Sequence, residues 1–254
     1  IIHLTADKPV LDFYAAIERG ERVSNFSYGT HQDEVIRDNR SGVIITGNCG
    51  GRKGLDFASA LFGESNGETR LLGDKVVVKG ASEAVLYITA NTNYNKENII
   101  ERTIKMAMSA RNKGFETCYS NHLTEWMPLY NRTTIGLQSV ETFIVPSMNK
   151  LYDAYTKDDY SELECICQGQ TKKMLDDYMV LLLFHFGRYI LLSSSRKCEM
   201  AANLQGIWCR DLLSVWDGKY TTNINLQMTY WPADSANMSE CFEPYIKLAE
   251  RIHK

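Results

Sequence analysis

The sequence predicts an α+β protein, with β-strands in its first part and helices through the rest. Two observations predict this class. Residues 1–95 contain short β-branched runs separated by turn sequences, with no long helical period between them. After this region, apolar residues recur at three- and four-residue steps, which is the spacing of one face of a helix. At 254 residues, the chain has the length of about two domains.

Three runs support the β part: residues 42–46, 75–78 and 84–89. Turn sequences such as Gly50-Gly51 and residues 79–82 separate them. Consecutive strands without long helices are typical of two packed sheets, so we expect a β-sandwich.

Four helices are expected after it. Asn98 can cap the first, whose apolar side chains reach Met108 before Gly114 ends it. A second follows over residues 115–130, where Pro128 should bend or cut the last turn. Residues 140–160 show no clean period and are expected to be a connection.

The helix expected at residues 172–194 is apolar on nearly all sides, so it should be packed within a helical assembly. Its longest apolar run, from Met179 to Phe186, contains His185 and falls short of the ~20 residues that a spanning helix needs. The last helix should begin at Pro244, a position where proline's missing N–H costs nothing.

Charge and composition narrow the partners. The net charge of −3 gives no electrostatic reason to expect nucleic acid or an anionic membrane, and we expect no membrane insertion. The seven cysteines are scattered, and only Cys165 and Cys167 are close together, without the second pair that zinc needs. We therefore expect free, mostly buried thiols, no metal and no cofactor. The first residue, Ile1, suggests an incomplete chain, and localisation and oligomeric state stay open.

Three of the four tryptophans lie between Asn203 and Trp231, together with the closely spaced Asn223 and Asn225. Aromatic rings cover the apolar face of a pyranose, and side-chain amides exchange hydrogen bonds with its hydroxyls. A core needs fewer buried amides, because each must find a partner. This segment therefore predicts a sugar-binding site.

Several ordered motifs then resemble one family. They are Ser193-Ser194-Ser195-Arg196, Asn203-Leu204-Gln205-Gly206-Ile207-Trp208, Lys219-Tyr220, Asn223-Ile224-Asn225-Leu226-Gln227-Met228, Tyr230-Trp231-Pro232-Ala233 and Ser239-Glu240-Cys241. Their order resembles the opening of the catalytic domain of glycoside hydrolase family 95, the inverting α-L-fucosidases. Upstream, residues 83–86, 122–123 and 129–132 resemble the end of that family's β-sandwich and its helical linker.

The resemblance implies an architecture. It places the C-terminal part of a β-sandwich at residues 1–95, a helical linker at 96–160 and the first helices of an (α/α)6 barrel at 161–254. It also implies a glycan substrate, and an extracellular or periplasmic location is open.

The resemblance also implies roles for the paired asparagines. Asn225 would activate the attacking water while polarised by an aspartate, and Asn223 would position water and substrate. The general-acid Glu and that Asp would lie beyond Lys254, so we expect the isolated chain to be inactive. Two residues apart, both amides share a face only in an extended segment, which we expect here. The alternative is structural: a helix N-cap and a buried, hydrogen-bonded asparagine.

Three more residues are expected to bind substrate. Trp216 and Tyr220 would form a stacking wall, whereas Trp208 and Trp231 are expected to pack in the core. Family members carry His or Thr at the position of Thr221. The small Thr leaves room for the 6-hydroxyl that L-galactose has and L-fucose lacks, so an α-L-galactosidase is an alternative. The alternative is that Thr221 simply continues an extended segment, because threonine prefers β structure.

The nearby carboxylates and two histidines are interpreted as structural residues. Nearby carboxylates are interpreted as structural, Glu240 through helix capping, and none is assigned as the acid; they are Asp211, Asp217, Asp234, Glu240 and Glu243. His122 and His185 are interpreted as core histidines. The alternative from another class is a non-catalytic carbohydrate-binding or scaffold piece.

Overall fold

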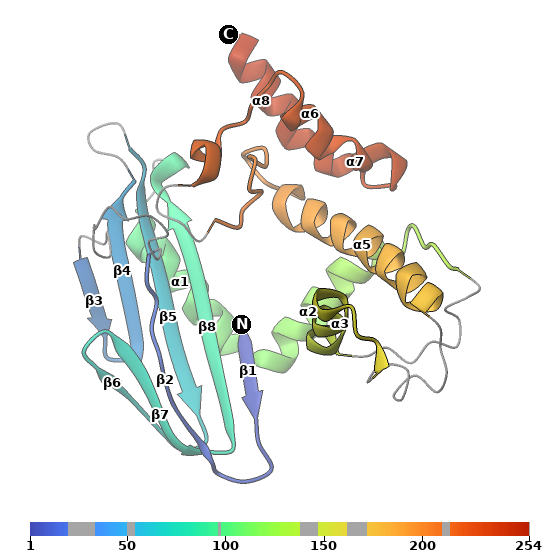
Figure 1. Ribbon diagram of the computed structural model, residues 1–254. Coiled ribbons are helices and arrows are strands. Elements are labelled where there is room, and N and C mark those ends of the chain that lie inside the picture. Colours follow the sequence, from blue (N-terminus) through green and yellow to red (C-terminus); the bar gives the residue numbers. More distant parts are fainter. Residues whose placement is uncertain are drawn as a thin grey trace. The chain divides into compact units, whose positions relative to one another are not determined.

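The computed structural model describes residues 1–19, 34–49, 54–95, 98–137, 147–161, 172–209 and 214–253. The chain forms two compact units (Figure 1). Residues 1–125 with 209–215 make the first, and residues 126–208 with 216–254 make the second. The first unit holds the antiparallel sheets and the helix that follows them, and the second holds the later helices, so the predicted order of β part and helices is confirmed.

Two antiparallel sheets form the first unit. Their strands are β1 (Ile2–Thr5), β2 (Leu11–Ala15), β3 (Glu34–Asp38), β4 (Gly42–Asn48), β5 (Asp56–Ser65), β6 (Glu68–Leu72), β7 (Lys75–Ala81) and β8 (Glu83–Thr92). In the described residues, one sheet has the order β1-β8-β5-β4-β3 and the other the order β2-β7-β6. The three β-branched runs of the sequence lie in β4, β7 and β8, as predicted.

Alternation along the strands gives the five-stranded sheet two buried faces. Val43 and Leu61 pack with Val76 of the other sheet, so the two sheets share a core. Their neighbours Ile44 and Phe62 point to the opposite face, where helix α1 covers them. This period of two is what a strand produces when both of its faces are buried.

Helix α1 (Ile99–Lys113) confirms both predicted ends. The side chain of Asn98 accepts from the backbone N–H of Glu101 at 3.3 Å. Gly114, with φ +75°, donates to the carbonyls of Ala110 and Arg111. Such caps satisfy helix-end groups that have no partner inside the helix.

The helices after α1 are α2 (Phe115–Tyr130), α3 (Met148–Lys157), α5 (Lys172–Ser195), α6 (Asn225–Tyr230), α7 (Pro232–Ser235) and α8 (Glu243–His253), with the short 3-10 turns η2 (Asn93–Asn95), η4 (Val215–Gly218) and η5 (Ser239–Phe242). Helix α2 contains Pro128 and continues to Tyr130. The expectation of a connection at residues 140–160 is wrong where α3 lies. This helix buries only Leu151 and Ala154, and two apolar residues three apart are too few to reveal a helical period in the sequence. Residues 140–146 lie outside the described residues.

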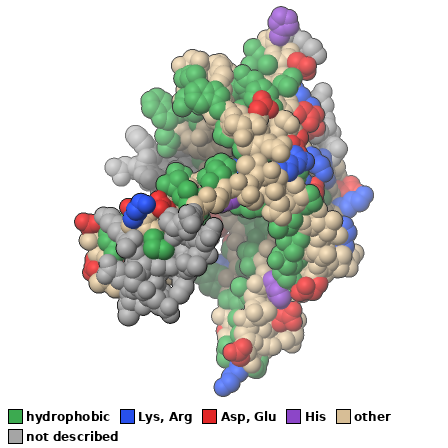
Figure 2. Space-filling model, turned by 90° about the vertical axis from the view of Figure 1, so that its right-hand side faces the viewer, with side chains coloured by type: hydrophobic (Ala, Val, Ile, Leu, Met, Phe, Trp, Pro, Cys, Tyr) green, Lys and Arg blue, Asp and Glu red, His purple; other side chains and the backbone are tan. Residues whose placement is uncertain are grey.

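Helix α5 differs from the expectation of a helix packed on all sides. Leu175, Leu191 and Leu192 are buried, but Val180 and Leu183 are 62% and 72% exposed. Figure 2 shows hydrophobic side chains at the molecular surface in several places. Apolar composition therefore did not determine burial, because no described residue covers this face.

By length and composition, residues Lys173–Ser195 also pass as a membrane span, with 28% of the apolar window buried, so the expectation that no segment reaches this length is wrong. His185 and Arg188 interrupt the strictly apolar run but leave its mean hydropathy high. Core helices of soluble proteins can have the same length and hydropathy, so these two properties do not identify a membrane segment. The absence of membrane insertion stays a prediction.

The core of the second unit is formed by buried side chains from α5, α6, α7 and η5, among them Leu192, Leu226 and Tyr230. Beside it lies Arg188, which is 1% exposed and is the largest fully buried side chain among the described residues. Arg188 donates to the carbonyls of Thr133 at 2.8 Å and Leu129 at 3.4 Å, at and beyond the end of α2. Its guanidinium also lies 5.1 Å from the ring centroid of Tyr130, so one buried cation holds this segment on α5.

Replacing Arg188 should therefore destabilise the helical unit. Arg188→Met keeps the length and apolar stem but leaves backbone carbonyls without their donor, and we expect the free energy of unfolding to fall by about 2 kcal/mol or more. Arg132→Met is the control, because Arg132 pairs with Glu240 at the surface and such pairs contribute about 1 kcal/mol or less. Urea unfolding followed by circular dichroism measures both. Equal losses would contradict the structural role of Arg188.

Candidate active site

Two joined segments of the second unit form the candidate site, and the five predicted site residues lie in the second of them. The first is a tight turn in which Gly206 N–H donates to Asn203 O at 2.9 Å, and the Asn203 side chain accepts from Gln205 N–H at 2.8 Å. Gly206 has φ +65°, and a Cβ there would lie 3.0 Å from the ring of Trp208. The turn therefore requires glycine at this position.

The second segment has strained backbone. Trp216, Asp217 and Thr221 have φ values of 56°, 58° and 49°. Positive φ is rare for residues other than glycine, and for a β-branched residue such as Thr221 it is an outlier. Each such residue costs about 1–3 kcal/mol and persists only where its surroundings fix it, which is common at functional sites. Leu204 N–H donates to Lys219 O at 3.2 Å and joins the two segments.

The paired asparagines follow this strained backbone. Residues 222–224 form a turn, and α6 begins at Asn225. The expected extended entry, for Thr221 as for the asparagines, is therefore wrong. Thr221 turns the chain, and its carbonyl accepts from the N–H of Leu226, five residues later, at 3.4 Å.

Helix capping does not explain these asparagines. The N-cap of α6 is Ile224, which makes no side-chain capping bond. Asn223 and Asn225 are both exposed. Within the described ranges neither side-chain amide has a hydrogen-bond partner, so the structural alternative proposed for them is wrong. Both amides are free to meet a ligand.

The aromatic side chains are arranged differently from the expectation. Trp216 is 78% exposed, and Tyr220 is half-buried against the core. Trp208 and Trp231 are 44% and 63% exposed, so their predicted core packing is wrong. Leu226 and Tyr230, four residues apart on one face of α6, are buried in the core. Trp231 does not lie on that face.

A groove of about 410 Å³ lies between α6 and α8, and Thr222, the residue before Asn223, lines it. Thr222, Leu226 and Gln227 line one side, and Tyr245 and Ile252 line the other. The Gln227 side chain donates to Thr222 O at 2.7 Å and so fixes the edge of the groove nearest to Asn223.

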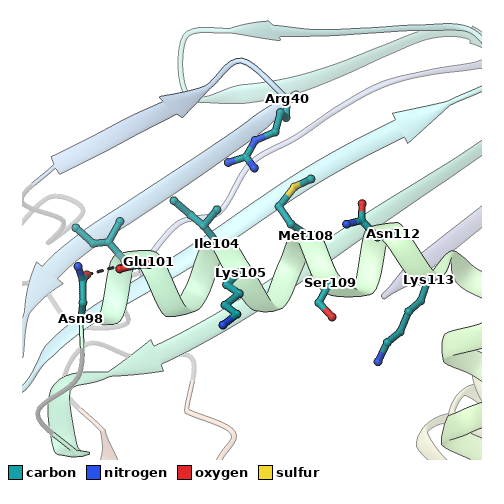
Figure 3. A pocket seen from close by; sticks show the side chains of 10 residues that line it. Arg40, Asn98, Glu101, Ile104, Lys105, Met108, Ser109, Asn112 and Lys113 are labelled. Carbon is teal, nitrogen blue, oxygen red and sulfur yellow. Dashed lines mark hydrogen bonds between the residues drawn. The ribbon is translucent and has the colours of Figure 1, made fainter.

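A larger cavity, of about 880 Å³, lies in the first unit along α1 (Figure 3). The figure shows Arg40 facing Ile104 and Met108, while Lys105 and Lys113 point away from it. This cavity contains none of the predicted site residues and no aromatic side chain. We therefore place the candidate site at the asparagines, despite the size of the other cavity.

Nearby carboxylates are held by cations. Asp217 pairs with Lys219 at 2.9 Å, and Glu243 with Lys247 at 2.9 Å. Glu240 pairs with Arg132 at 2.7 Å and does not cap, because the N-cap of η5 is Met238 and makes no side-chain bond. Asp234 is exposed, and Asp211 lies outside the described residues.

The described thiols are single residues without disulfide partners, and their exposure varies. The described cysteines are free, but Cys49 and Cys209 are exposed and Cys241 alone among them is buried, so the expectation of mostly buried thiols is wrong. Cys165 and Cys167 lie outside the described residues. In the described ranges no cluster of three metal-binding side chains occurs.

Comparison with known proteins decides the family. The sequence model of the glycosyl hydrolase family 95 catalytic domain matches residues 114–254. Alpha-L-fucosidase 2 of Arabidopsis thaliana is 36% identical in an alignment of 204 residues that covers 76% of this chain and 23% of that protein. The probable alpha-fucosidase A of Aspergillus niger is 28% identical, over 66% of this chain and 21% of that protein.

The chain belongs to glycosyl hydrolase family 95. It spans about a fifth to a quarter of the length of the curated relatives that it matches. All five predicted site residues, from Trp216 to Asn225, lie inside the region that the family's catalytic-domain model covers.

Sequence reasoning missed the residue that ties the site to its surroundings. Tyr230 is buried at the end of α6, and its hydroxyl bonds to Ser195 and to the backbone next to Asn203. Three serines in a row at the end of an apolar helix, Ser193 to Ser195, were the available signal of a buried polar network.

The two histidines predicted to lie in the core differ from each other in burial. His122 is exposed. His185 contacts the ring of Tyr130, and its Nδ1 is buried without a partner in the described residues. Burial, and the nearby Arg188 charge, lower the pKa of His185 below its ordinary 6.5.

The helical unit should therefore lose stability as pH falls. Below pH 6.5 the unfolded state binds a proton that folded His185 resists, so the free energy of unfolding decreases toward the lowered pKa and is undiminished above 6.5. His185→Phe removes this titration and keeps a ring. Urea unfolding at pH 7.5, 6.5 and 5.5 should give a flatter dependence for the variant. The same dependence in both proteins would show that His185 does not contribute.

Proposed function

We propose that this chain is the part of an inverting α-L-fucosidase that carries the water-activating asparagines, Asn225 and Asn223. One observation carries the proposal. In a family 95 chain, both amides are exposed next to strained backbone and have no partner in the described residues. The printed names of the relatives, alpha-L-fucosidase and probable alpha-fucosidase, support fucosyl residues, for example α-1,2-linked, as the substrate.

The proposed architecture follows the family. The two sheets would be the C-terminal part of a β-sandwich at residues 1–95, followed by a helical linker at 96–160. Residues 161–254 would begin an (α/α)6 barrel. The exposed apolar stripe on α5, which includes Val180, Leu183 and Phe186, supports this proposal, because further barrel helices would remove it from water.

The proposed mechanism uses two groups on opposite faces of the sugar. An acid protonates the leaving oxygen, and a base about 6.5–9.5 Å away activates water on the other face. Here the amide oxygen of Asn225 would accept a hydrogen bond from that water, and Asn223 would hold water and substrate. A neutral amide is a weak base, so an aspartate accepting from the amide nitrogen must polarise it. The acid and this aspartate would lie outside the 254 residues.

Trp216 and Tyr220 would stack on the sugar or on the group that leaves. The exposure of Trp216 and the partial burial of Tyr220 support one solvent-facing ring and one ring packed against the core beside the asparagines.

Asn225 is the residue to test first. In the protein encoded by the whole gene, Asn225→Ala should lower kcat for 2′-fucosyllactose about 100-fold or more, because the water loses its activating group. Gln227→Ala, on the same helix but facing the groove, is the matched comparison and should lose less. Released fucose measures both, and the 254-residue chain alone should release none. Unchanged kcat in Asn225→Ala would remove Asn225 from catalysis.

An α-L-galactosidase is the second candidate, because Thr221 is small and half-buried beside the asparagines. Histidine adopts positive φ more readily than threonine, so Thr221→His should be accepted by the backbone at this position. If Thr221 admits a 6-hydroxymethyl group, the variant should lower kcat/KM for the L-galactoside relative to the L-fucoside about tenfold or more.

Matched aryl α-L-fucoside and α-L-galactoside substrates measure this ratio. A ratio that is the same in both proteins would remove Thr221 from specificity. Absence of turnover of either sugar by the wild-type protein, together with binding of free L-fucose, would favour a non-catalytic carbohydrate-binding protein.

A further inference from the structure

A buried hydroxyl connects the two segments of the candidate site to the helices beneath them. Tyr230 is the last residue of α6, and 1% of its surface is exposed. Its ring packs against Phe242 and Tyr245, with centroids 5.8 Å and 5.4 Å away. A hydroxyl buried this deeply must be hydrogen-bonded, since an unpaired one costs about 1–3 kcal/mol.

The hydroxyl has two partners with complementary roles. The backbone N–H of Ala202 donates to the Tyr230 oxygen at 2.8 Å. The Tyr230 proton can then point to Ser195 Oγ, 2.9 Å away at the end of α5. Ser195 Oγ lies 3.3 Å from Ser194 Oγ, and Ser194 donates to Leu191 O at 3.3 Å. These hydrogen bonds therefore attach Tyr230, at the end of α6, to the end of α5.

The Ala202 contact closes a circuit of bonds through the site. Ala202 precedes the Asn203 turn, and Leu204 in that turn donates to Lys219 O. Two residues later, Thr221 O accepts from Leu226 N–H in the first turn of α6. Helix α6 then returns to Tyr230. The Asn203 turn, the segment that ends at Thr221, and α6 are thus each joined to the next by a hydrogen bond. The buried hydroxyl of Tyr230 closes this circuit of bonds.

We propose that Tyr230 is a positioning residue for Asn223 and Asn225, acting through its hydroxyl bonds to Ala202 and Ser195. This inference rests on the proposed function. A weakly basic amide must hold its water close to the reacting carbon, and a displacement of about 1 Å can cost about 100-fold in rate. The exposed asparagines have no side-chain bond of their own in the described residues, so their placement depends on the backbone that this circuit holds.

The test compares two tyrosine hydroxyls of the helical unit in the protein encoded by the whole gene. Tyr230→Phe keeps the ring packing and removes only the hydroxyl. Tyr155→Phe is the control: its hydroxyl also donates a hydrogen bond, to Asp176 at 2.7 Å, in contacts outside the circuit. With 2′-fucosyllactose, we expect kcat to fall about 10- to 100-fold in Tyr230→Phe, with KM changed less than about threefold.

Tyr155→Phe should keep kcat within about twofold at the same temperature, well below unfolding. Ser195→Ala should also lower kcat, and the double variant Ser195→Ala with Tyr230→Phe should lose less than the product of the two single losses, because both act on one bond. Unchanged kcat in Tyr230→Phe, an equal loss in Tyr155→Phe, or a change in KM and stability alone would overturn the proposal.

A second measurement separates this inference from the proposed function. In the 254-residue chain, nuclear magnetic resonance resolves the side-chain amides of Asn203, Asn223 and Asn225 without any turnover. Tyr230→Phe should shift or broaden these signals and speed hydrogen exchange at the Ala202 N–H, whereas Tyr155→Phe should change neither. If the wild-type protein releases no fucose but these signals respond, the function fails and the positioning stands. If fucose is released and the signals do not respond, the positioning fails.

Discussion

A polar group that folding removes from water costs free energy unless it finds a partner inside the protein, and the helical unit is arranged largely around that requirement. An apolar helix, α5, carries a buried arginine and two buried serines on its inner side. Arg188 finds backbone carbonyls after α2, and Ser195 finds the hydroxyl of Tyr230. These bonds determine which segments lie against α5, because an apolar surface alone would accept them in many registers.

The candidate site lies on the segments that these hydrogen bonds hold against α5, and its backbone is strained. Trp216, Asp217 and Thr221 all have positive φ within six residues. Backbone of this kind unfolds readily unless its neighbours hold it, and here the Asn203 turn and the start of α6 do so through backbone bonds. The result is a short surface segment on which two amides and an indole are exposed without being loosely placed. This segment lies inside the region that the family's catalytic-domain model covers.

Local signals in the sequence predicted local structure well. Asn98 and Gly114 bounded α1, because capping depends on only a few neighbouring residues. The β-branched runs became strands, since their side chains suit a pleated, buried surface. The asparagine pair was recognised as a candidate site from residue type and spacing. Its local shape was not, because the φ of Thr221 depends on a carbonyl bond to Leu226 that no residue type encodes.

By itself the sequence determined the order of a β part and helices and the family, and it proposed the residues of the candidate site, because hydrophobic period, caps and ordered motifs are properties of neighbouring residues. Only the tertiary structure decided burial. It placed Tyr230 inside and Trp231 outside, left Val180 and Leu183 uncovered, and joined Ala202 to a tyrosine 28 residues away. Burial depends on which distant segments meet, and the partner of a buried hydroxyl is chosen by geometry in space.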